Sequence, residues 1–211
     1  MHRAGLWLFS IASCTSPSAH AVLAGDTVCV TLGGEPFADV NYRAEPRPFV
    51  FPLLGPGSVP MTRSFPMAEA QDEERDHPHH QSLWFAHGDV SGFDFWAGQS
   101  HRERIVIDGP CEVSNDGAGA RVRCRYRWLA SEDTLVATEL RELVFGGTPD
   151  ARTIDIAVTL RPGSGPLVFG DTKEGTFALR VHPNLRVEGK VATGVLQNSE
   201  GLRGVDVWGK R

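Results

Sequence analysis

The sequence has no run of apolar residues close to the roughly 18 to 20 that a membrane-spanning helix needs, so we expect no transmembrane segment. It has no excess of basic residues either, because 21 lysines and arginines stand against 26 acidic residues and give a net charge of −5. General nucleic-acid binding depends on basic contacts to phosphates, so we expect no nucleic-acid partner. The sequence also lacks a Gly-x-Ser-x-Gly elbow, a phosphate-binding loop and a dinucleotide-binding fingerprint, which argues against the enzyme classes that those motifs define.

The first 21 residues have the organisation of an export signal. Met1-His2-Arg3 is a short positive start, residues 6–12 are apolar, and Ala19-His20-Ala21 fits a small-x-small cleavage pattern. Cleavage after Ala21 would leave residues 22–211 as a single domain in the periplasm or outside the cell. The residues before Cys14 also resemble a lipobox, and cleavage there would instead leave a lipid-anchored surface protein.

Cysteine is scarce, and the spacing of the four residues resembles neither a zinc knuckle nor a Cys-x-x-Cys redox pair. In an oxidising compartment, Cys29, Cys111 and Cys124 allow at most one disulfide. Asn115-Asp116-Gly117-Ala118-Gly119 has the residue types of a hairpin turn. If Gly117 and Ala118 are at its centre, Cys111 lies opposite Cys124, near enough for a disulfide in an exported protein.

Glycine and proline are abundant, with 23 and 14 residues, and they favour turns over long helices. Several segments alternate between apolar and polar residues with the period of two that indicates β-strands. Residues 134–145 fit either a helix or a strand, and the hairpin loop after them favours a strand. We therefore predict one all-β domain, a mainly antiparallel β-sandwich, with strands at residues 28–31, 38–42, 104–107, 111–113, 121–128, 134–145, 153–160, 167–170 and 176–181.

The alternation is clearest in residues 121–128. It predicts that four arginines face outward and that the residues between them face the core, namely Val122, Cys124, Tyr126 and Trp128. Such an arginine stripe could bind an acidic glycan. The alternative, which the sequence favours, is a solvated surface neutralised by acidic residues on the next strand.

Half of the eight histidines lie within eleven residues, as His77, His79, His80 and His87. Imidazole can bind a metal, exchange a proton near neutral pH or donate to a sugar hydroxyl. On an extended strand His77 and His79 would share one side and His80 the other, so two rings could converge on a metal. A third ligand would come from His87 or His101. A divalent metal is thus compatible with the cluster without being required, and the alternative is a set of ordinary core or surface histidines.

The loop Gly170-Asp171-Thr172-Lys173-Glu174-Gly175 is a second candidate site, because functional residues often lie in loops at strand ends. Asp171 or Glu174 would act as a general base, and Lys173 would stabilise an oxyanion. Ordinary hairpin-loop chemistry is the alternative. Near the histidines, Trp84 and Trp96 would stack on the apolar face of a sugar ring, unless they pack in the core.

Together these segments resemble a bacterial family called "methane oxygenase PmoA-like". The resemblance covers roughly residues 28 to 211, with a small departure at Gln81-Ser82, where the family has Arg-Gly. The segments that carry it are Asp76-His77-Pro78-His79-His80, Leu83-Trp84-Phe85-Ala86-His87-Gly88-Asp89-Val90, Gly92-x-Asp94-Phe95-Trp96, Phe169-Gly170-Asp171-Thr172-Lys173-Glu174-Gly175, Leu179-Arg180-Val181, Asn198-Ser199-x-Gly201 and Trp208-Gly209-Lys210-Arg211.

The family's label does not fit this chain, because a particulate methane oxygenase subunit is a bundle of membrane helices and this sequence predicts none. The resemblance implies instead an exported β-sandwich protein of carbohydrate-degrading bacteria, similar in architecture to the galactose-mutarotase-like supersandwich. It also implies further strands after Arg211. We therefore expect a truncated domain with an exposed sheet edge or apolar patch near residues 204–211, and poor solubility.

We expect an exported protein that acts on a carbohydrate or a sugar derivative, as a hydrolase, lyase or epimerase if it is an enzyme. The acid, base and binding groups would line one pocket and comprise His77, His79, His80, His87, Asp171, Lys173 and Glu174. Trp84, Trp96 and Arg180 would bind the substrate, Arg180 through a hydroxyl or a carboxylate. The alternative is a non-catalytic carbohydrate-binding module that uses the same residues.

Overall fold

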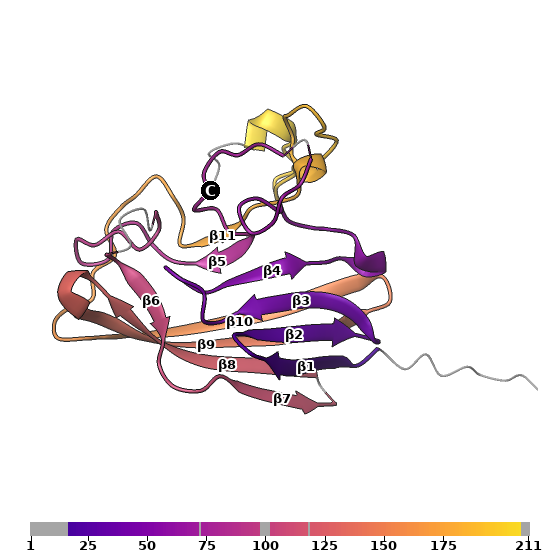
Figure 1. The fold of residues 1–211 in the computed structure, drawn as a ribbon. Helices are drawn as coiled ribbons and strands as arrows, with labels where there is room; N and C mark the ends of the chain where they lie inside the picture. Colours follow the sequence, from indigo (N-terminus) through magenta and orange to yellow (C-terminus); the bar gives the residue numbers. More distant parts are fainter. Residues whose placement is uncertain (1–16, 72, 98–101, 118, 208–211) are drawn as a thin grey trace, which may run out of the picture.

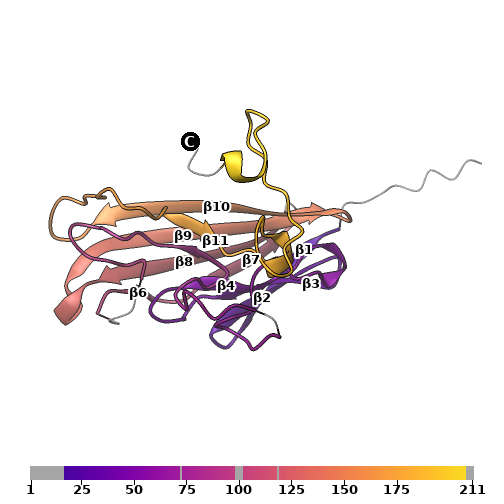
Figure 2. The same cartoon turned by 90° about the horizontal axis from the view of Figure 1, so that it is seen from above.

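The computed structural model describes residues 17–71, 73–97, 102–117 and 119–207. Its strands form two antiparallel sheets, one of six strands and one of five, which lie in two layers with the apolar core between them (Figures 1 and 2). Over these residues the only helices are short 3-10 turns, and none could cross a membrane. The predicted all-β, mainly antiparallel sandwich is therefore confirmed, and the galactose-mutarotase-like supersandwich stays a prediction.

The six-stranded sheet begins as a meander and ends with strands from the middle and the end of the chain. Its spatial order is β1 (Ala19–Ala24), β2 (Thr27–Leu32), β3 (Glu35–Asn41), β4 (Phe49–Leu53), β5 (Leu83–Phe85) and β11 (Phe177–Leu179). Residues 54–82 separate β4 from β5, and among those that the structure describes the 3-10 turn η1 (Pro56–Ser58) is the only helix and there is no strand. This long connection carries the first part of the histidine segment to the sheet.

The second sheet contains the longest strands and follows the predicted alternation. Its order is β10 (Ala151–Pro162), β9 (Leu135–Thr148), β8 (Gly119–Leu129) and β6 (Arg104–Ile107), with β7 (Glu112–Asp116) also paired to β8. The turn η2 (Ser131–Asp133) connects β8 to β9. Residues 134–145, which fit a helix or a strand, are thus almost entirely strand. Alternate residues of β8 are buried, as period-two alternation requires.

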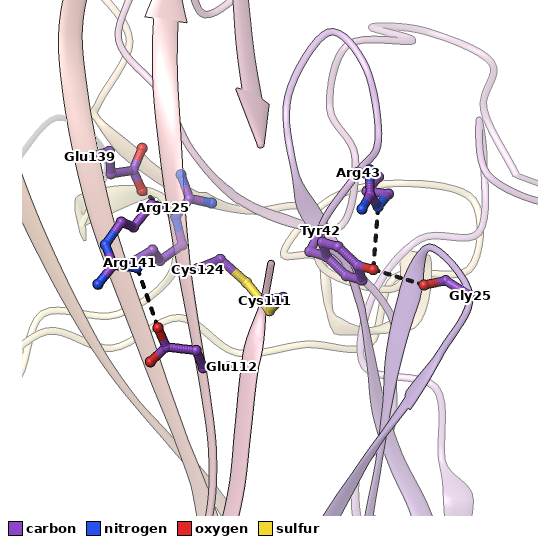
Figure 3. The surroundings of a disulfide bond; sticks show 9 residues. All are labelled: Gly25, Tyr42, Arg43, Cys111, Glu112, Cys124, Arg125, Glu139 and Arg141. Atoms are coloured by element: carbon purple, nitrogen blue, oxygen red, sulfur yellow. Dashed lines mark hydrogen bonds and ion pairs between the residues drawn. A yellow bond between two sulfur atoms is a disulfide. The ribbon is translucent and has the colours of Figure 1, made fainter. Parts of the chain in front are cut away.

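The β7–β8 hairpin has the predicted register, with Asp116 paired to Gly119. Cys111 and Cys124 form a disulfide across it with a Cα–Cα distance of 4.6 Å (Figure 3). Cys29 is a free thiol. The outward arginines of β8 are paired with acids rather than presented to a ligand. Arg123 and Arg125 both contact Glu112, and Arg121 contacts Glu142 on β9. The solvated-surface interpretation of the stripe is therefore the one that the contacts support.

Between the sheets lies an ion pair that the sequence analysis did not anticipate. Glu139 and Arg141 are successive inward-facing residues of β9, and their side chains are almost completely buried. The Nε1 atom of Trp128 donates to Oε2 of Glu139 at 2.7 Å. Arg141 lies over the rings of Phe85 and Tyr126. Each charge therefore has a polar or aromatic partner, which buried ions require.

The last part of the chain departs from the predicted strands. Residues 167–170 contribute an isolated bridge from Phe169 to Val90, and the strand predicted at 176–181 is reduced to β11. The turns η3 (Pro183–Leu185) and η4 (Gly204–Val207) follow, outside the two layers (Figure 1). Val205 is 66% exposed, which fits the expected exposure of apolar side chains in this region. It lies in a 3-10 turn and not at a sheet edge. Residues 208–211 lie outside the described residues, and the truncation itself stays a prediction.

The N-terminal strand bears on the position of the predicted signal cleavage. Residues 1–16, including Cys14, lie outside the described residues, but Ala19 and Ala21 are buried in β1. Asn115 on β7 donates to the carbonyl oxygen of Ala21 and accepts from its N–H. Cleavage after Ala21 would remove half of β1 and these contacts, whereas export by itself stays a prediction.

Candidate functional site

The three histidines of the first motif gather at a turn. The expectation of an extended strand was wrong, because His77 has a φ of 46° and its carbonyl oxygen accepts from the N–H of His80 at 2.9 Å. This reversal brings all three rings together instead of placing His80 on the opposite side. The ring centroids of His77 and His80 lie 4.8 Å apart, and those of His79 and His80 lie 4.5 Å apart. We call these three residues the histidine cluster.

Asp76 holds the histidine cluster in place through three partners. Its Oδ2 atom lies 2.5 Å from Nδ1 of His77, its Oδ1 atom accepts from Arg63, and both oxygens lie 3.1 Å from Nη2 of Arg180. The Arg63 side chain is buried and also donates to the carbonyl oxygens of Asp76 and His77. The turn is thus fixed to Arg63, 13 positions before Asp76, and to Arg180, which directly follows β11. Arg180 does bind a carboxylate here, but it is that of Asp76.

The Asp76–His77 pair has the arrangement that general bases use. Although partial burial raises the pKa of Asp76, the hydrogen bond from His77 and the charges of Arg180 and Arg63 outweigh it and hold that pKa well below its usual range. Asp76 is therefore a carboxylate at neutral pH. It accepts the Nδ1 proton of His77 and leaves Nε2 as the basic nitrogen. The His77 side chain is 53% exposed, so a ligand in solvent can reach it.

His79 and His80 are held as neutral rings. Desolvation, followed by the charge of Arg47, lowers the pKa of His79, and Glu174 and Asp94 offset part of this effect. Desolvation and the neighbouring charges of His79 and Arg180 lower the pKa of His80 to about 4. A neutral imidazole presents one donor and one acceptor, which suits a ligand with hydroxyl groups.

The tryptophans lie beneath the histidine cluster and do not form an open stacking surface. Trp84 is 3% exposed and Trp96 is 5% exposed. Their rings therefore pack in the core, which was the alternative to stacking on a sugar. His80 stacks on Trp84 with centroids 5.3 Å apart and contacts Trp96 edge-on. The Nε1 atoms of both indoles are buried and have no hydrogen-bond partner among the described residues.

Arg47 is a site residue that the sequence analysis missed. It is 1% exposed, and its guanidinium lies over the ring of Trp84 and donates to the carbonyl oxygen of His79. Desolvation lowers its pKa to about 10, against the opposing charge of Asp94. The signal in the sequence is weak: an arginine between two prolines, 30 residues before the motif.

His87 serves a different purpose from the other three. Its Nε2 atom lies 2.8 Å from the carbonyl oxygen of Gly170, and its Nδ1 atom lies 3.1 Å from Oγ1 of Thr176. A carbonyl can only accept, so Nε2 donates its proton to Gly170, and Nδ1 pairs with the threonine hydroxyl. Both nitrogens are therefore occupied, and His87 fastens the 170–175 loop to β5 as a positioning residue.

The two candidate segments lie side by side, and they are joined through His87 rather than through the predicted charged groups. Glu174 approaches closely enough to act electrostatically on His79. The Lys173 side chain is 89% exposed and pairs with Glu174 at 3.4 Å. Asp171 is exposed and forms no hydrogen bond or ion pair with a described residue. Glu174 is thus a loop residue that acts electrostatically on the histidine cluster, and a shared pocket stays a prediction.

A metal site is not assembled by the described residues, where no group of three His, Cys, Asp or Glu side chains converges on a common point. His77 already donates to Asp76, and His87 uses both of its nitrogens elsewhere. His101, the alternative third ligand, lies outside the described residues. A divalent metal at this cluster stays a prediction.

The comparisons with known proteins assign the chain to a family but assign no function to the site. No curated protein matches the chain. No solved structure matches it either. A family model matches residues 27–211, which include every strand after β1 and all of the site residues above. By that match, the chain belongs to the family described as "Family of unknown function (DUF6807)".

Proposed function

We propose that the histidine cluster acts on a carbohydrate or a sugar derivative. The observation that carries the proposal is the Asp76–His77 pair, an exposed imidazole oriented by a carboxylate, beside two neutral histidines. Such a surface offers a base together with several hydrogen-bond donors and acceptors, and a polyhydroxylated ligand needs both kinds of group.

In this proposal His77 is the general base. Asp76 selects the tautomer with Nε2 free and stabilises the imidazolium that forms when His77 takes a proton from the ligand. His79 and His80 bind hydroxyl groups, and Glu174 supplies a nearby negative charge. Proton transfer at one carbon or one hydroxyl is common to hydrolases, lyases and epimerases, so the proposal covers these three reaction classes.

Two further observations support an exported, sugar-related protein. The Cys111–Cys124 disulfide is typical of proteins from oxidising compartments, which fits a signal at residues 1–21 or a lipid anchor at Cys14. The motifs that contain Asp76, His77 and Arg180 are also those that resemble the "methane oxygenase PmoA-like" family, and the resemblance implies carbohydrate-degrading bacteria. We keep this finer family assignment as part of the proposal.

The test is a panel of neutral and acidic mono- and oligosaccharides, with binding measured by calorimetry and conversion measured by NMR of the sugar. The test variant is His77→Gln, which keeps a donor at nearly the same place but removes the base. His20→Gln, made in the full 211-residue chain with residues 1–21 retained, is the matched control, because His20 is an exposed histidine on β1. Conversion that His77→Gln abolishes and His20→Gln preserves supports an enzyme.

The alternative function is a carbohydrate-binding module without turnover. It is favoured by the occupied nitrogens of His87 and by the pairing of Arg180 with Asp76, which leave fewer groups for chemistry. A module would bind a sugar without converting it, and His79→Ala would weaken that binding. Absence of both binding and conversion across the panel would refute the two functions together.

A further inference from the structure

Arg47 is a buried cation without an acidic partner. Its guanidinium forms no ion pair with any described residue, and its Nε and Nη1 atoms are buried without a hydrogen-bond partner there. The Nη2 atom alone is satisfied, by the carbonyl oxygen of His79. Burying a charge is costly unless it is paired and hydrogen-bonded. Arg63 shows the usual solution in the same protein, because its equally buried guanidinium binds Asp76 and several carbonyl oxygens.

Among the described residues, two further unsatisfied groups near Arg47 are also donors, and they lie beside unpartnered ring nitrogens of His79 and His80. Nε1 of Trp84 and Nε1 of Trp96 are buried and unpartnered, and an indole nitrogen can donate but never accept. The guanidinium carbon of Arg47 lies 5.7 Å from the Trp84 ring centroid, and the two indole centroids are 5.0 Å apart. Four donor atoms of these three adjacent side chains thus lack an acceptor among the described residues.

The surroundings supply little compensating negative charge. Asp94 acts electrostatically on Arg47, but its Oδ1 atom accepts from the N–H groups of Trp96 and Ala97. Glu174 acts on His79 and pairs with Lys173. His79 and His80, which pack above the tryptophans, are both held neutral. An incoming anion would therefore meet the positive charge of Arg47, which Asp94 offsets in part.

We propose that Arg47, Trp84 and Trp96 bind an anionic group of the ligand, and that this group is the carboxylate of a sugar acid. The inference rests on the proposed function, which it narrows from sugars in general to uronic and aldonic acids. A carboxylate has two acceptor oxygens and about four lone-pair positions, which match a guanidinium fork and two indole donors. A neutral hydroxyl would satisfy fewer of these donors and leave the charge of Arg47 uncompensated.

To reach these donors the ligand displaces the His80 ring from Trp84, while His77 stays bound to Asp76. His80 covers Trp84 and is itself only partly buried, so it lies on the solvent side of the indole. The segment from His77 to Ser82 is bounded by two non-glycine residues with positive φ values, 46° and 58°. Such conformations are disfavoured, which lowers the cost of rearranging the segment between them.

The experiment follows the indole N–H resonances of the full chain by NMR during titration with glucuronate, with glucose, and with acetate as a sugar-free carboxylate. Trp84→Phe and Trp96→Phe assign the two signals. The Trp128 signal is the internal control, because its N–H already donates to Glu139. We expect glucuronate to shift the Trp84 and Trp96 signals, and to bind about tenfold or more tightly than glucose.

Arg47→Met removes the charge with little change in length, and Arg152→Met is the matched control. The Arg152 side chain is also buried and stacks on Phe37, far from the site in the sheet order. Arg47→Met should abolish the preference for glucuronate, and Arg152→Met should keep it. The wild-type titration decides the question even if Arg47→Met does not fold.

Each outcome is distinct. Glucose and glucuronate shifting the signals equally would overturn the anion inference and keep the sugar function. Acetate shifting both indole signals without any sugar binding would support the anion site and refute the sugar function. No shift with either carboxylate would overturn the inference.

Discussion

Nδ1 of His77 and Oδ2 of Asp76 lie 2.5 Å apart, although the two residues are neighbours in sequence and their side chains would diverge on an extended strand. The positive φ of His77 turns the backbone so that the side chains meet. This contact makes His77 the histidine best prepared for proton transfer.

Asp76→Asn should therefore lower turnover much more than binding. The amide keeps the size of the side chain but cannot stabilise a His77 imidazolium, and it can present a donor to Nδ1, which selects the other tautomer. We expect turnover to fall about 100-fold or more, with ligand affinity changed far less. Sugar conversion and calorimetry on the same samples measure the two effects. Equal losses in both would contradict the role of a general-base dyad.

The same residue should make stability depend on acidic pH. The pKa of Asp76 is lower in the folded protein than in the unfolded chain, so its contribution is complete above the unfolded value of about 3.9 and disappears as the pH falls through the folded value. Urea unfolding measured from about pH 2 to about pH 7 tests this. The free energy of unfolding should fall more steeply with acid in the wild type than in Asp76→Asn. Parallel curves would show that Asp76 is not stabilised by its partners.

His80 predicts a second pH effect in a different window. Its pKa is lowered to about 4 in the folded protein, so between that value and the unfolded value of about 6.5 the unfolded chain binds more protons. Stability should thus decrease as the pH falls through this window, and His80→Gln should reduce the slope. NMR titration of the His80 ring gives the pKa directly, and a value near 6.5 would refute the prediction.

Reduction of the Cys111–Cys124 disulfide should destabilise the protein. The cysteines are 13 positions apart, and a loop of this size corresponds to about 3 kcal/mol of unfolding free energy. Cys111→Ser with Cys124→Ser should show the same loss in urea without reductant. Cys29→Ser is the control, because that thiol is free and should contribute little. A double variant as stable as the wild type would contradict the expectation.

The buried ion pair of β9 should respond differently to single and double replacement. Glu139→Gln leaves Arg141 as an uncompensated buried charge, and we expect a loss of about 3–5 kcal/mol. Replacing both residues by Met removes the charges together and should cost much less, although Trp128 then loses its acceptor. Urea midpoints of the three proteins test this. Equal losses for the single and double variants would show that packing, not charge, dominates.

The period of two predicted most of the second sheet because its strands are long and each has one buried face. The turn at Gly117-Ala118 fixes the register of the hairpin, so the sequence alone predicts that Cys111 lies opposite Cys124. Residues 176–181 also look like a strand locally, but their partner β5 has only three residues, so pairing stops early. Local pattern indicates that a strand can form, whereas its length depends on the partner.

The site was predictable only in part, for a related reason. The histidine motif marks its position, but its geometry depends on Arg63 and Arg180, which are 13 and 104 positions from Asp76. Arg47 approaches His79 from 32 positions away. No local pattern reports such distant partners, and the expected strand alternation separated rings that the turn brings together.

The two hydrogen bonds between Ala21 and Asn115 join residues 94 positions apart, and they link the first strand of one sheet to the hairpin of the other. Contacts between such distant residues slow folding, because a large loop must close before they form. As the chain emerges from the ribosome, β1 to β3 are complete long before that hairpin exists. Their apolar face therefore stays exposed to solvent until the second sheet has been synthesised. During synthesis the β1–β3 meander is thus prone to aggregate, and we expect a chaperone to bind there.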